Sequence, residues 1–238
     1  PDLTRIDIKN SITDPYENIY VKTYNLNNPI NLVVLCDISS SMFVSKNNDA
    51  MMKALSKIIA KSAIDQGDRF GMICFNDSIE NNYLLEPGNN FQYINKWIDG
   101  IIFDTNRNSS NGIKKIDKYL PEEKSLVFLI SDFHYSLKKI DRILGQLSNH
   151  HVIPIFISSE GEIRKMPNYG FRKFTDSELD LEHEVFLRPS VKDKILSDYE
   201  EMKIKIFNVF SKKHLKQIVI NGDIDIETIQ KYFLGTYI

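Results

Sequence analysis

The sequence contains only two cysteines, Cys36 and Cys74, among its 238 residues. Both lie within apolar runs, so we interpret them as small core residues in a reducing compartment and exclude a disulfide framework. Long hydrophobic runs are absent as well. The longest, at 32–36, 126–130 and 152–157, fall far below the roughly 18 residues that a membrane span needs. We therefore expect no membrane span in this chain.

Neither sign of charge dominates the composition. There are 30 Lys and Arg against 32 Asp and Glu, which gives a formal net charge of −2. A nucleic-acid binder that relies on a basic face is therefore not expected. The sequence begins at Pro1 without a signal-peptide pattern. We expect a cytoplasmic protein, with room for a membrane anchor upstream of Pro1.

Apolar and aromatic residues are abundant instead. They include 14 Phe and 11 Tyr, enough to bury the core of one large domain. Short apolar runs alternate with helical patterns along the chain. We expect strands at 31–36, 68–75, 83–85, 125–130, 152–157 and 215–220, and helices at 49–65, 91–98, 111–120, 137–147, 191–210 and 225–234. This alternation predicts an α/β fold, with a mostly parallel, doubly wound (Rossmann-like) sheet and helices on both faces.

Two features refine this organisation. Pro154 has no backbone N–H to donate, so its strand is expected at or near a sheet edge. Residues 170–176 and 184–187 read as a small hairpin outside the main alternation. We therefore expect a lead-in segment at 1–30 that packs on the domain, and an α/β domain at 31–238 with a small β insertion near 168–188.

Polar residues follow two of the predicted buried strands. Asp37, Ser39 and Ser41 form a DxSxS pattern after the first strand, and Asp132 follows the strand at 125–130. Parallel sheets bind ligands at the carboxyl ends of their strands. In an extended loop, residues two apart point the same way, so the DxSxS side chains can converge. All are hard oxygen donors with no softer ligand among them, which suits Mg²⁺, Mn²⁺ or Ca²⁺ and disfavours Zn²⁺.

Several of these residues have a plainer interpretation. Asp and Ser directly after a strand are common helix caps and turn residues. His134 follows Asp132 and either lines this edge or is simply solvated. Phe133 and Tyr135 either form an exposed apolar collar for a partner or pack into the sheet. A second Asp at the end of another buried strand favours the metal site.

The pair of motifs DISSSM at 37–42 and SDF at 131–133 resembles the metal-ion-dependent adhesion site of von Willebrand factor A (VWA) domains. The chain is similar to one branch in particular, the MoxR-associated VWA proteins, known as domain of unknown function 58. Residues 5–7 and 20–22, LISDF at 129–133, HHVIPIFIS at 150–158 and the tail through NGDIDIETIQKYF support this. The resemblance spans nearly the whole chain and implies a VWA-type fold.

In VWA domains another ligand, usually Thr, comes from a Gly-Gly-Thr type of loop. This chain lacks that tripeptide. Ser110, in the sequence Ser-Asn-Gly-Ile just before a predicted helix, imitates the family pattern best, and Thr105 is the rival. The resemblance thus implies a site made of Asp37, Ser39, Ser41, Asp132 and either Ser110 or Thr105.

The resemblance also implies a function. It predicts a Mg²⁺-dependent binding module, not an enzyme, that captures an acidic side chain of a partner protein and acts with a MoxR-type AAA+ ATPase in the maturation of protein complexes. The chain has no Gly-x-x-x-x-Gly-Lys-Ser/Thr loop, so ATP hydrolysis would belong to that partner. The alternatives are a Mg²⁺-dependent phosphatase or phosphotransfer domain with Asp37 as nucleophile, and a VWA scaffold with a degenerate metal site.

Overall fold

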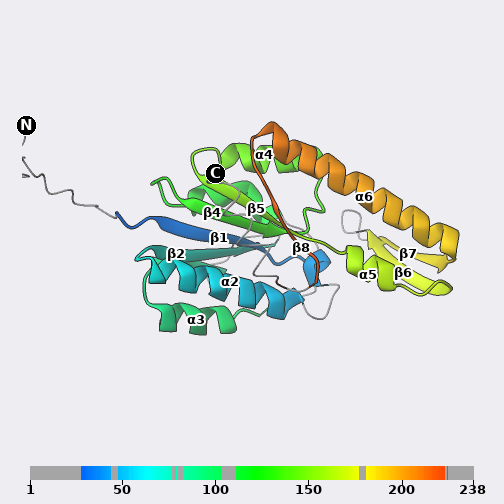
Figure 1. The fold of residues 1–238 in the computed structure, drawn as a ribbon, viewed down its shortest axis with the longest axis horizontal. Helices are drawn as coiled ribbons and strands as arrows, with labels where there is room; N and C mark the ends of the chain where they lie inside the picture. The colour runs from blue at the N-terminus through cyan, green and yellow to red at the C-terminus, as the bar shows by residue number, and fades with distance from the viewer. Residues whose placement is uncertain are drawn as a thin grey trace, which may run out of the picture.

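The computed structural model describes residues 28–43, 48–76, 79, 83–102, 111–176, 181–222 and 224. Their main feature is a six-stranded sheet in the order β3-β2-β1-β4-β5-β8 (Figure 1). The strands are β1 (Asn31–Asp37), β2 (Arg69–Phe75), β3 (Leu84–Gly88), β4 (Leu126–Ser131), β5 (His151–Ile157) and β8 (Ile218–Ile220). Every neighbouring pair is parallel except β2 and β3. The predicted doubly wound α/β fold is confirmed.

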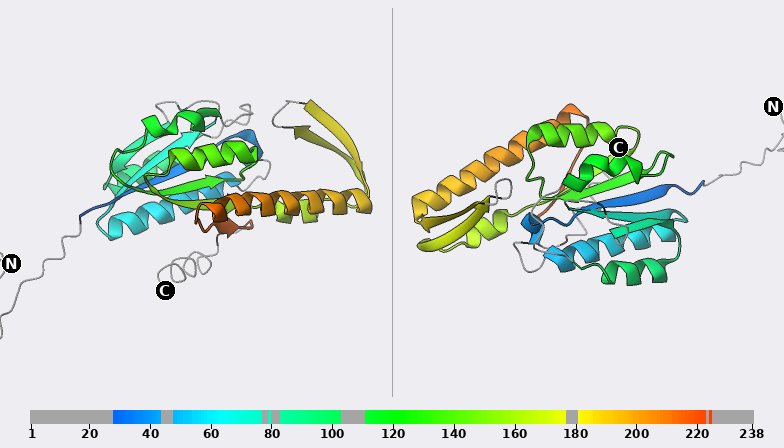
Figure 2. Two further views of the ribbon diagram at one scale, coloured as in Figure 1. Left: turned by 90° about the horizontal axis from the view of Figure 1, so that it is seen from above. Right: turned by 180° about the vertical axis from the view of Figure 1, so that it is seen from behind.

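The sheet is buried on both faces because helices cover each side. All seven residues of β1 are buried, and they alternate between two cores. Val34 and Cys36 pack in the core of α2 (Asn48–Asp65) and α3 (Phe91–Asp99). Val33 and Leu35 pack in the core of α4 (Leu137–Gln146) and α6 (Pro189–Lys212). The two layers lie on opposite sides of the sheet (Figures 1 and 2).

Three elements differ from the sequence-based expectation. The segment Asn111–Lys118 forms the 3-10 helix η4 where an α-helix was predicted. The helix α5 (Glu160–Lys165) was not predicted, because six residues are too few to show a helical period. The last strand spans only three residues, since the N–H groups of His214 and Leu215 still close the end of α6. The predicted helix at 225–234 and most of the lead-in segment lie outside the described residues.

Pro154, which has no backbone N–H, lies in a strand next to the edge of the sheet. Its strand β5 is next to the short edge strand β8, so it is near the edge of the sheet, as predicted. Pairing with β8 starts only at Ile155, and Pro154 pairs with Leu129 of β4 on the other side. The missing N–H therefore leaves no gap in the β5–β8 ladder.

A two-stranded hairpin projects beyond the main sheet next to α5 and α6 (Figure 2). It consists of β6 (Gly170–Asp176) and β7 (Leu181–Leu187), paired over seven antiparallel positions. The exposed rings of Phe171 and Phe186 meet across it, 5.0 Å apart between centroids. None of the described helices is both long enough and apolar enough to cross a lipid bilayer.

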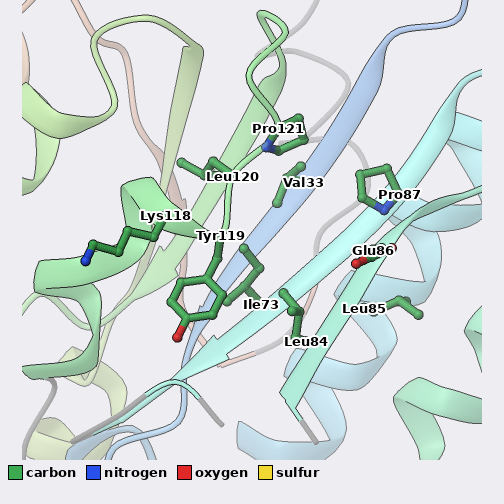
Figure 3. Close-up of a pocket in the computed structure, with 10 residues that line it drawn as sticks. All are labelled: Val33, Ile73, Leu84, Leu85, Glu86, Pro87, Lys118, Tyr119, Leu120 and Pro121. Atoms are coloured by element: carbon green, nitrogen blue, oxygen red, sulfur yellow. The ribbon is translucent and has the colours of Figure 1, made fainter. Parts of the chain in front are cut away.

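A cavity of about 170 Å³ lies between β3 and the residues that follow η4. Figure 3 shows Val33 and Ile73 at its floor and Tyr119 beside them. Most of the residues around it have apolar side chains, and none of them belongs to the DxSxS or SDF motif. It is therefore a packing gap at the edge of the sheet, separate from the predicted metal site.

Gly71 tests how tightly β2 and β3 pack. A Cβ atom there would lie 3.0 Å from the carbonyl oxygen of Leu85 and 3.1 Å from the ring of Pro87. We expect Gly71→Ala to lower the free energy of unfolding by about 1–3 kcal/mol, because backbone must move to admit the methyl group. Urea denaturation measures this change.

Gly145 in α4 is the matched control, since nothing lies within 4 Å of a Cβ there. Gly145→Ala should raise the free energy of unfolding by about 0.5–1 kcal/mol through helix propensity. Equal effects of the two substitutions would contradict the close approach at Gly71.

Candidate metal centre

Asp37, Ser39, Ser41 and Asp132, four of the predicted site residues, lie at the carboxyl ends of β1 and β4. These two strands are neighbours and parallel, so their ends lie at the same edge of the sheet. Chain connections leave in opposite directions here, towards β2 on one side and β5 on the other, which makes this the switch point of the sheet. Asp37 is the last residue of β1, and Asp132 directly follows β4. We call this edge the rim.

Asp37 is fully buried, and hydrogen bonds occupy both of its carboxylate oxygens. Its Oδ1 accepts from the backbone N–H of Ser39 at 2.9 Å. Its Oδ2 accepts from the Ser131 hydroxyl at 2.8 Å and also from the Tyr135 hydroxyl. Asp37 thus holds the first loop and the end of β4 together.

The DxSxS side chains converge, but not through an extended loop. The chain turns into the 3-10 helix η2 (Ser40–Phe43) directly after Ser39. This turn brings the Oγ atoms of Ser39 and Ser41 to 3.2 Å from each other. The expected extended conformation is therefore wrong, because the Ser39 N–H bond to Asp37 bends the backbone. The expected pair of neighbouring hydroxyls, from Ser39 and Ser41, is nevertheless present.

A tight turn follows β4 and places several polar groups on the rim. Phe133 has a φ of +52°, a left-handed conformation that is uncommon outside glycine. Its N–H donates to the Ser131 hydroxyl at 2.9 Å, and the N–H of Tyr135 donates to its carbonyl oxygen at 2.6 Å. The Phe133 ring is buried, stacked on Phe156 and edge-on to Phe210. This packing stabilises the strained backbone.

The collar interpretation of the aromatic residues is therefore wrong for Phe133. Its ring lies in the core between β5 and α6, and Tyr135 is only half-buried beside it. The Tyr135 hydroxyl instead contacts the site, as a donor to Asp37. Sequence reasoning did not assign it this role, because no spacing rule links a Tyr after β4 to an Asp at the end of β1.

Asp132 has one oxygen that hydrogen bonds do not use. Its side chain is 4% exposed. Its Oδ1 accepts from the N–H of His134 at 3.1 Å, whereas its Oδ2 is buried without a hydrogen-bond partner among the described residues. A buried carboxylate oxygen that accepts no hydrogen bond is costly, so Oδ2 has the capacity to bind a ligand.

The pKa values of the rim residues also favour a bound cation. Burial raises the pKa of Asp37 to about 6, and the charge of Asp132 adds to the rise, against the hydrogen bonds from Tyr135 and Ser39. Burial and both carboxylates also raise the pKa of the Tyr135 hydroxyl well above its usual value. Tyr135 therefore remains a proton donor at neutral pH. Two buried carboxylates close together are stabilised by a cation.

The donor set fits a divalent cation. Asp132 offers a carboxylate oxygen that accepts no hydrogen bond, Ser39 and Ser41 offer neighbouring hydroxyls, and Asp37 orients Ser39. Among the described residues, no three side chains of the His, Cys, Asp and Glu types lie close enough to hold an ion together. Hydroxyl and water oxygens would have to complete the coordination. The two candidates for the further ligand, Ser110 and Thr105, lie outside the described residues.

Removing the Tyr135 hydroxyl should destabilise the protein. Tyr135→Phe deletes a donor to a buried carboxylate, so we expect a loss of about 1.5–3 kcal/mol in the free energy of unfolding with EDTA present. Urea denaturation measures it. Tyr93→Phe, at a 60% exposed tyrosine, is the control and should change stability by less than about 0.5 kcal/mol. Similar effects of both substitutions would contradict the contact with Asp37.

Asp132→Asn should separate charge repulsion from metal binding. In EDTA the variant should unfold with a free energy about 1 kcal/mol higher than the wild type, because the buried charge of Asp132 that acts on Asp37 is gone. With Mg²⁺ at about 100 times its Kd, the wild type should gain about 2.7 kcal/mol. The variant should gain almost nothing.

Thermal unfolding with EDTA and then with Mg²⁺ measures both effects. Asp141→Asn is the matched control, because Asp141 is 65% exposed and pairs with Lys213. It should respond to Mg²⁺ like the wild type. A full response of Asp132→Asn to Mg²⁺ would show that Asp132 does not bind the ion.

Comparison with known proteins identifies the family of this chain and structures with a similar fold. The chain matches the family model described as "Protein of unknown function DUF58" over residues 2–204. No curated protein matches it. The structure of BatB from Bacteroides thetaiotaomicron aligns with a TM-score of 0.51 and 12% identity, covering 87% of this chain and 97% of that one.

Two further structures are similar at lower scores. The VWA domain of SpRpn10 aligns with a TM-score of 0.48 and 9% identity, over 86% of this chain and 95% of that one. Proximal thread matrix protein 1 from the mussel byssus, with a zinc-occupied MIDAS motif, aligns with a TM-score of 0.44 and 18% identity, over 75% of this chain and 47% of that one. The chain thus spans less than half of the mussel protein. The chain belongs to the DUF58 family and has a VWA-type α/β fold.

Proposed function

We propose that this protein is a metal-dependent protein-binding module whose rim captures an acidic side chain of a partner. The observation that carries the proposal is the buried Oδ2 of Asp132, which accepts no hydrogen bond from the described residues, near a second buried carboxylate, Asp37. The ion would be held by Asp132, Ser39 and Ser41, with Ser110 or Thr105 as a further ligand. Mg²⁺ is the expected ion, with Mn²⁺ and Ca²⁺ as alternatives.

The roles of the chain's own residues favour capture over catalysis. Ser39 and Ser41 are neutral donors, so a bound ion would keep much of its positive charge and supply Lewis acidity towards a carboxylate. Asp37 accepts three hydrogen bonds and is fully buried, which removes it as a free nucleophile. A phosphotransfer reaction needs such a nucleophile within reach of substrate. These contacts therefore weigh against the phosphatase alternative.

The partner is proposed from family membership. The MoxR-associated branch that the sequence resembles implies a MoxR-type AAA+ ATPase as partner, in the maturation or chaperoning of protein complexes. An acidic side chain of that ATPase, or of a client protein bound to it, would complete the coordination at the rim. The two buried free cysteines favour a reducing compartment, which supports a cytoplasmic location.

Binding of a purified MoxR-type ATPase tests the proposal. We expect binding by calorimetry with millimolar Mg²⁺, and at least roughly tenfold weaker binding with EDTA or with Asp132→Asn, because the bridging ion is lost in both. The exposed-site control Asp141→Asn should bind like the wild type. Equal affinity of the wild type with and without a divalent ion would contradict metal-dependent capture.

A further inference from the structure

The turn after β4 places two side chains of different chemistry on the same side of the rim. Asp132 and His134 flank Phe133, whose left-handed backbone is fixed by its buried ring. The N–H of His134 donates to Asp132 Oδ1, which closes a short ring between the two residues. This arrangement holds the imidazole beside the carboxylate. A strained backbone held this firmly is typical of functional sites.

The distance between the two side chains is informative. His134 Nδ1 lies 3.6 Å from Asp132 Oδ2. This separation is too long for a hydrogen bond, which needs about 2.7–3.2 Å. It lies at the upper end of what two ligands of one ion show, because neighbouring ligands at about 2.0–2.2 Å from an ion are roughly 2.8–3.1 Å apart at octahedral angles and roughly 3.3–3.6 Å apart at tetrahedral angles.

The surroundings of these two atoms also fit a shared ion. Asp132 Oδ2 is buried and accepts no hydrogen bond from the described residues, and it is the carboxylate oxygen that His134 Nδ1 approaches. The Asp132 side chain is 4% exposed and the His134 side chain 35% exposed. Of these two side chains, His134 is therefore the one that solvent reaches more easily.

We propose that His134 Nδ1 is a direct ligand of the rim ion together with Asp132 Oδ2, and that it makes the site selective for Mn²⁺, Co²⁺ or Zn²⁺ over Mg²⁺. This inference rests on the proposed metal-dependent function and specifies its ion. Imidazole nitrogen binds first-row transition ions far better than it binds Mg²⁺, which prefers oxygen. The sequence analysis considered oxygen donors for this ion, and His134 would add a nitrogen donor to that set.

The competing explanation is a plain electrostatic contact between an imidazolium and a carboxylate. It predicts that His134 changes the affinity for every divalent ion little and in the same direction. A ligand role predicts a loss confined to ions that bind nitrogen. The two explanations therefore differ in selectivity, which is measurable without any partner protein.

Calorimetric titration of the full chain with MnCl₂ and with MgCl₂ at neutral pH tests the proposal. We expect the wild type to bind Mn²⁺ at least roughly tenfold more tightly than Mg²⁺. His134→Ala should weaken Mn²⁺ binding by roughly 10- to 100-fold, the loss seen when metal-supporting groups are removed. Its Mg²⁺ affinity should stay within about twofold, since Mg²⁺ does not depend on the imidazole.

The matched control is His151→Ala. His151 is an exposed histidine at the first position of β5, at the opposite end of the sheet from the rim. It should leave both affinities unchanged. Electron spin-echo spectroscopy of bound Mn²⁺ supplies a second readout, namely coupling to a directly bound imidazole nitrogen. This coupling should be present in the wild type and in His151→Ala, and absent in His134→Ala.

The outcomes separate this inference from the proposed function. Loss of Mn²⁺ binding in Asp132→Asn but not in His134→Ala, with no nitrogen coupling, would overturn the role of His134 alone. Unchanged Mn²⁺ binding in both variants would overturn the metal site itself. Selective loss of Mn²⁺ affinity in His134→Ala, together with loss of the nitrogen coupling, would establish the ligand.

Discussion

The meeting of two buried carboxylates at the ends of neighbouring parallel strands is the constraint on which the rest of the rim depends. Asp37 and Asp132 come from the centre of the sheet, where water cannot solvate them well. Each must therefore be satisfied by local donors or by a cation. Asp37 takes the first solution, with Tyr135, Ser131 and Ser39 as donors. Asp132 has a donor for Oδ1 only, and its Oδ2 accepts no hydrogen bond from the described residues. Asp37 is therefore a structural anchor, whereas Asp132 keeps an oxygen available for a ligand.

Aromatic packing makes this arrangement rigid. The Phe133 ring joins Phe156 of β5 and Phe210 of α6 in one cluster, so the turn after β4 is anchored on two further elements. At the end of β5, the hydroxyl of Tyr199 in α6 accepts a hydrogen bond from the N–H of Ser159. The same hydroxyl lies 3.2 Å from the Ser158 hydroxyl oxygen. The rim is therefore backed on this side by α6 as well as by the sheet. Such support keeps donor groups in place before any ligand arrives.

Sequence reasoning predicted the parts of this structure that depend on periodicity. The strand ends at Asp37 and Asp132 followed from continuous apolar runs, and their meeting followed from parallel pairing. The remaining parts depend on contacts that no local pattern encodes. The hydroxyl of Tyr135 reaches Asp37 across 98 positions, and the left-handed Phe133 is favoured by packing against α6. The turn at Ser40 and the short helix α5 were missed because each is too brief to show a period.

The position of β1 at the centre of the sheet has a consequence for how the protein is made. β1 pairs with β2, 38 positions further along, but the Ser131 contact with Asp37 spans 94 positions. Contacts of such long range are slow to form, because closing a long loop costs conformational entropy before the contact contributes any stability. During synthesis the rim cannot exist until β4 has left the ribosome and aligned with β1. A nascent or truncated chain that ends before residue 131 would therefore leave Asp37 without either of its hydroxyl donors, Ser131 and Tyr135.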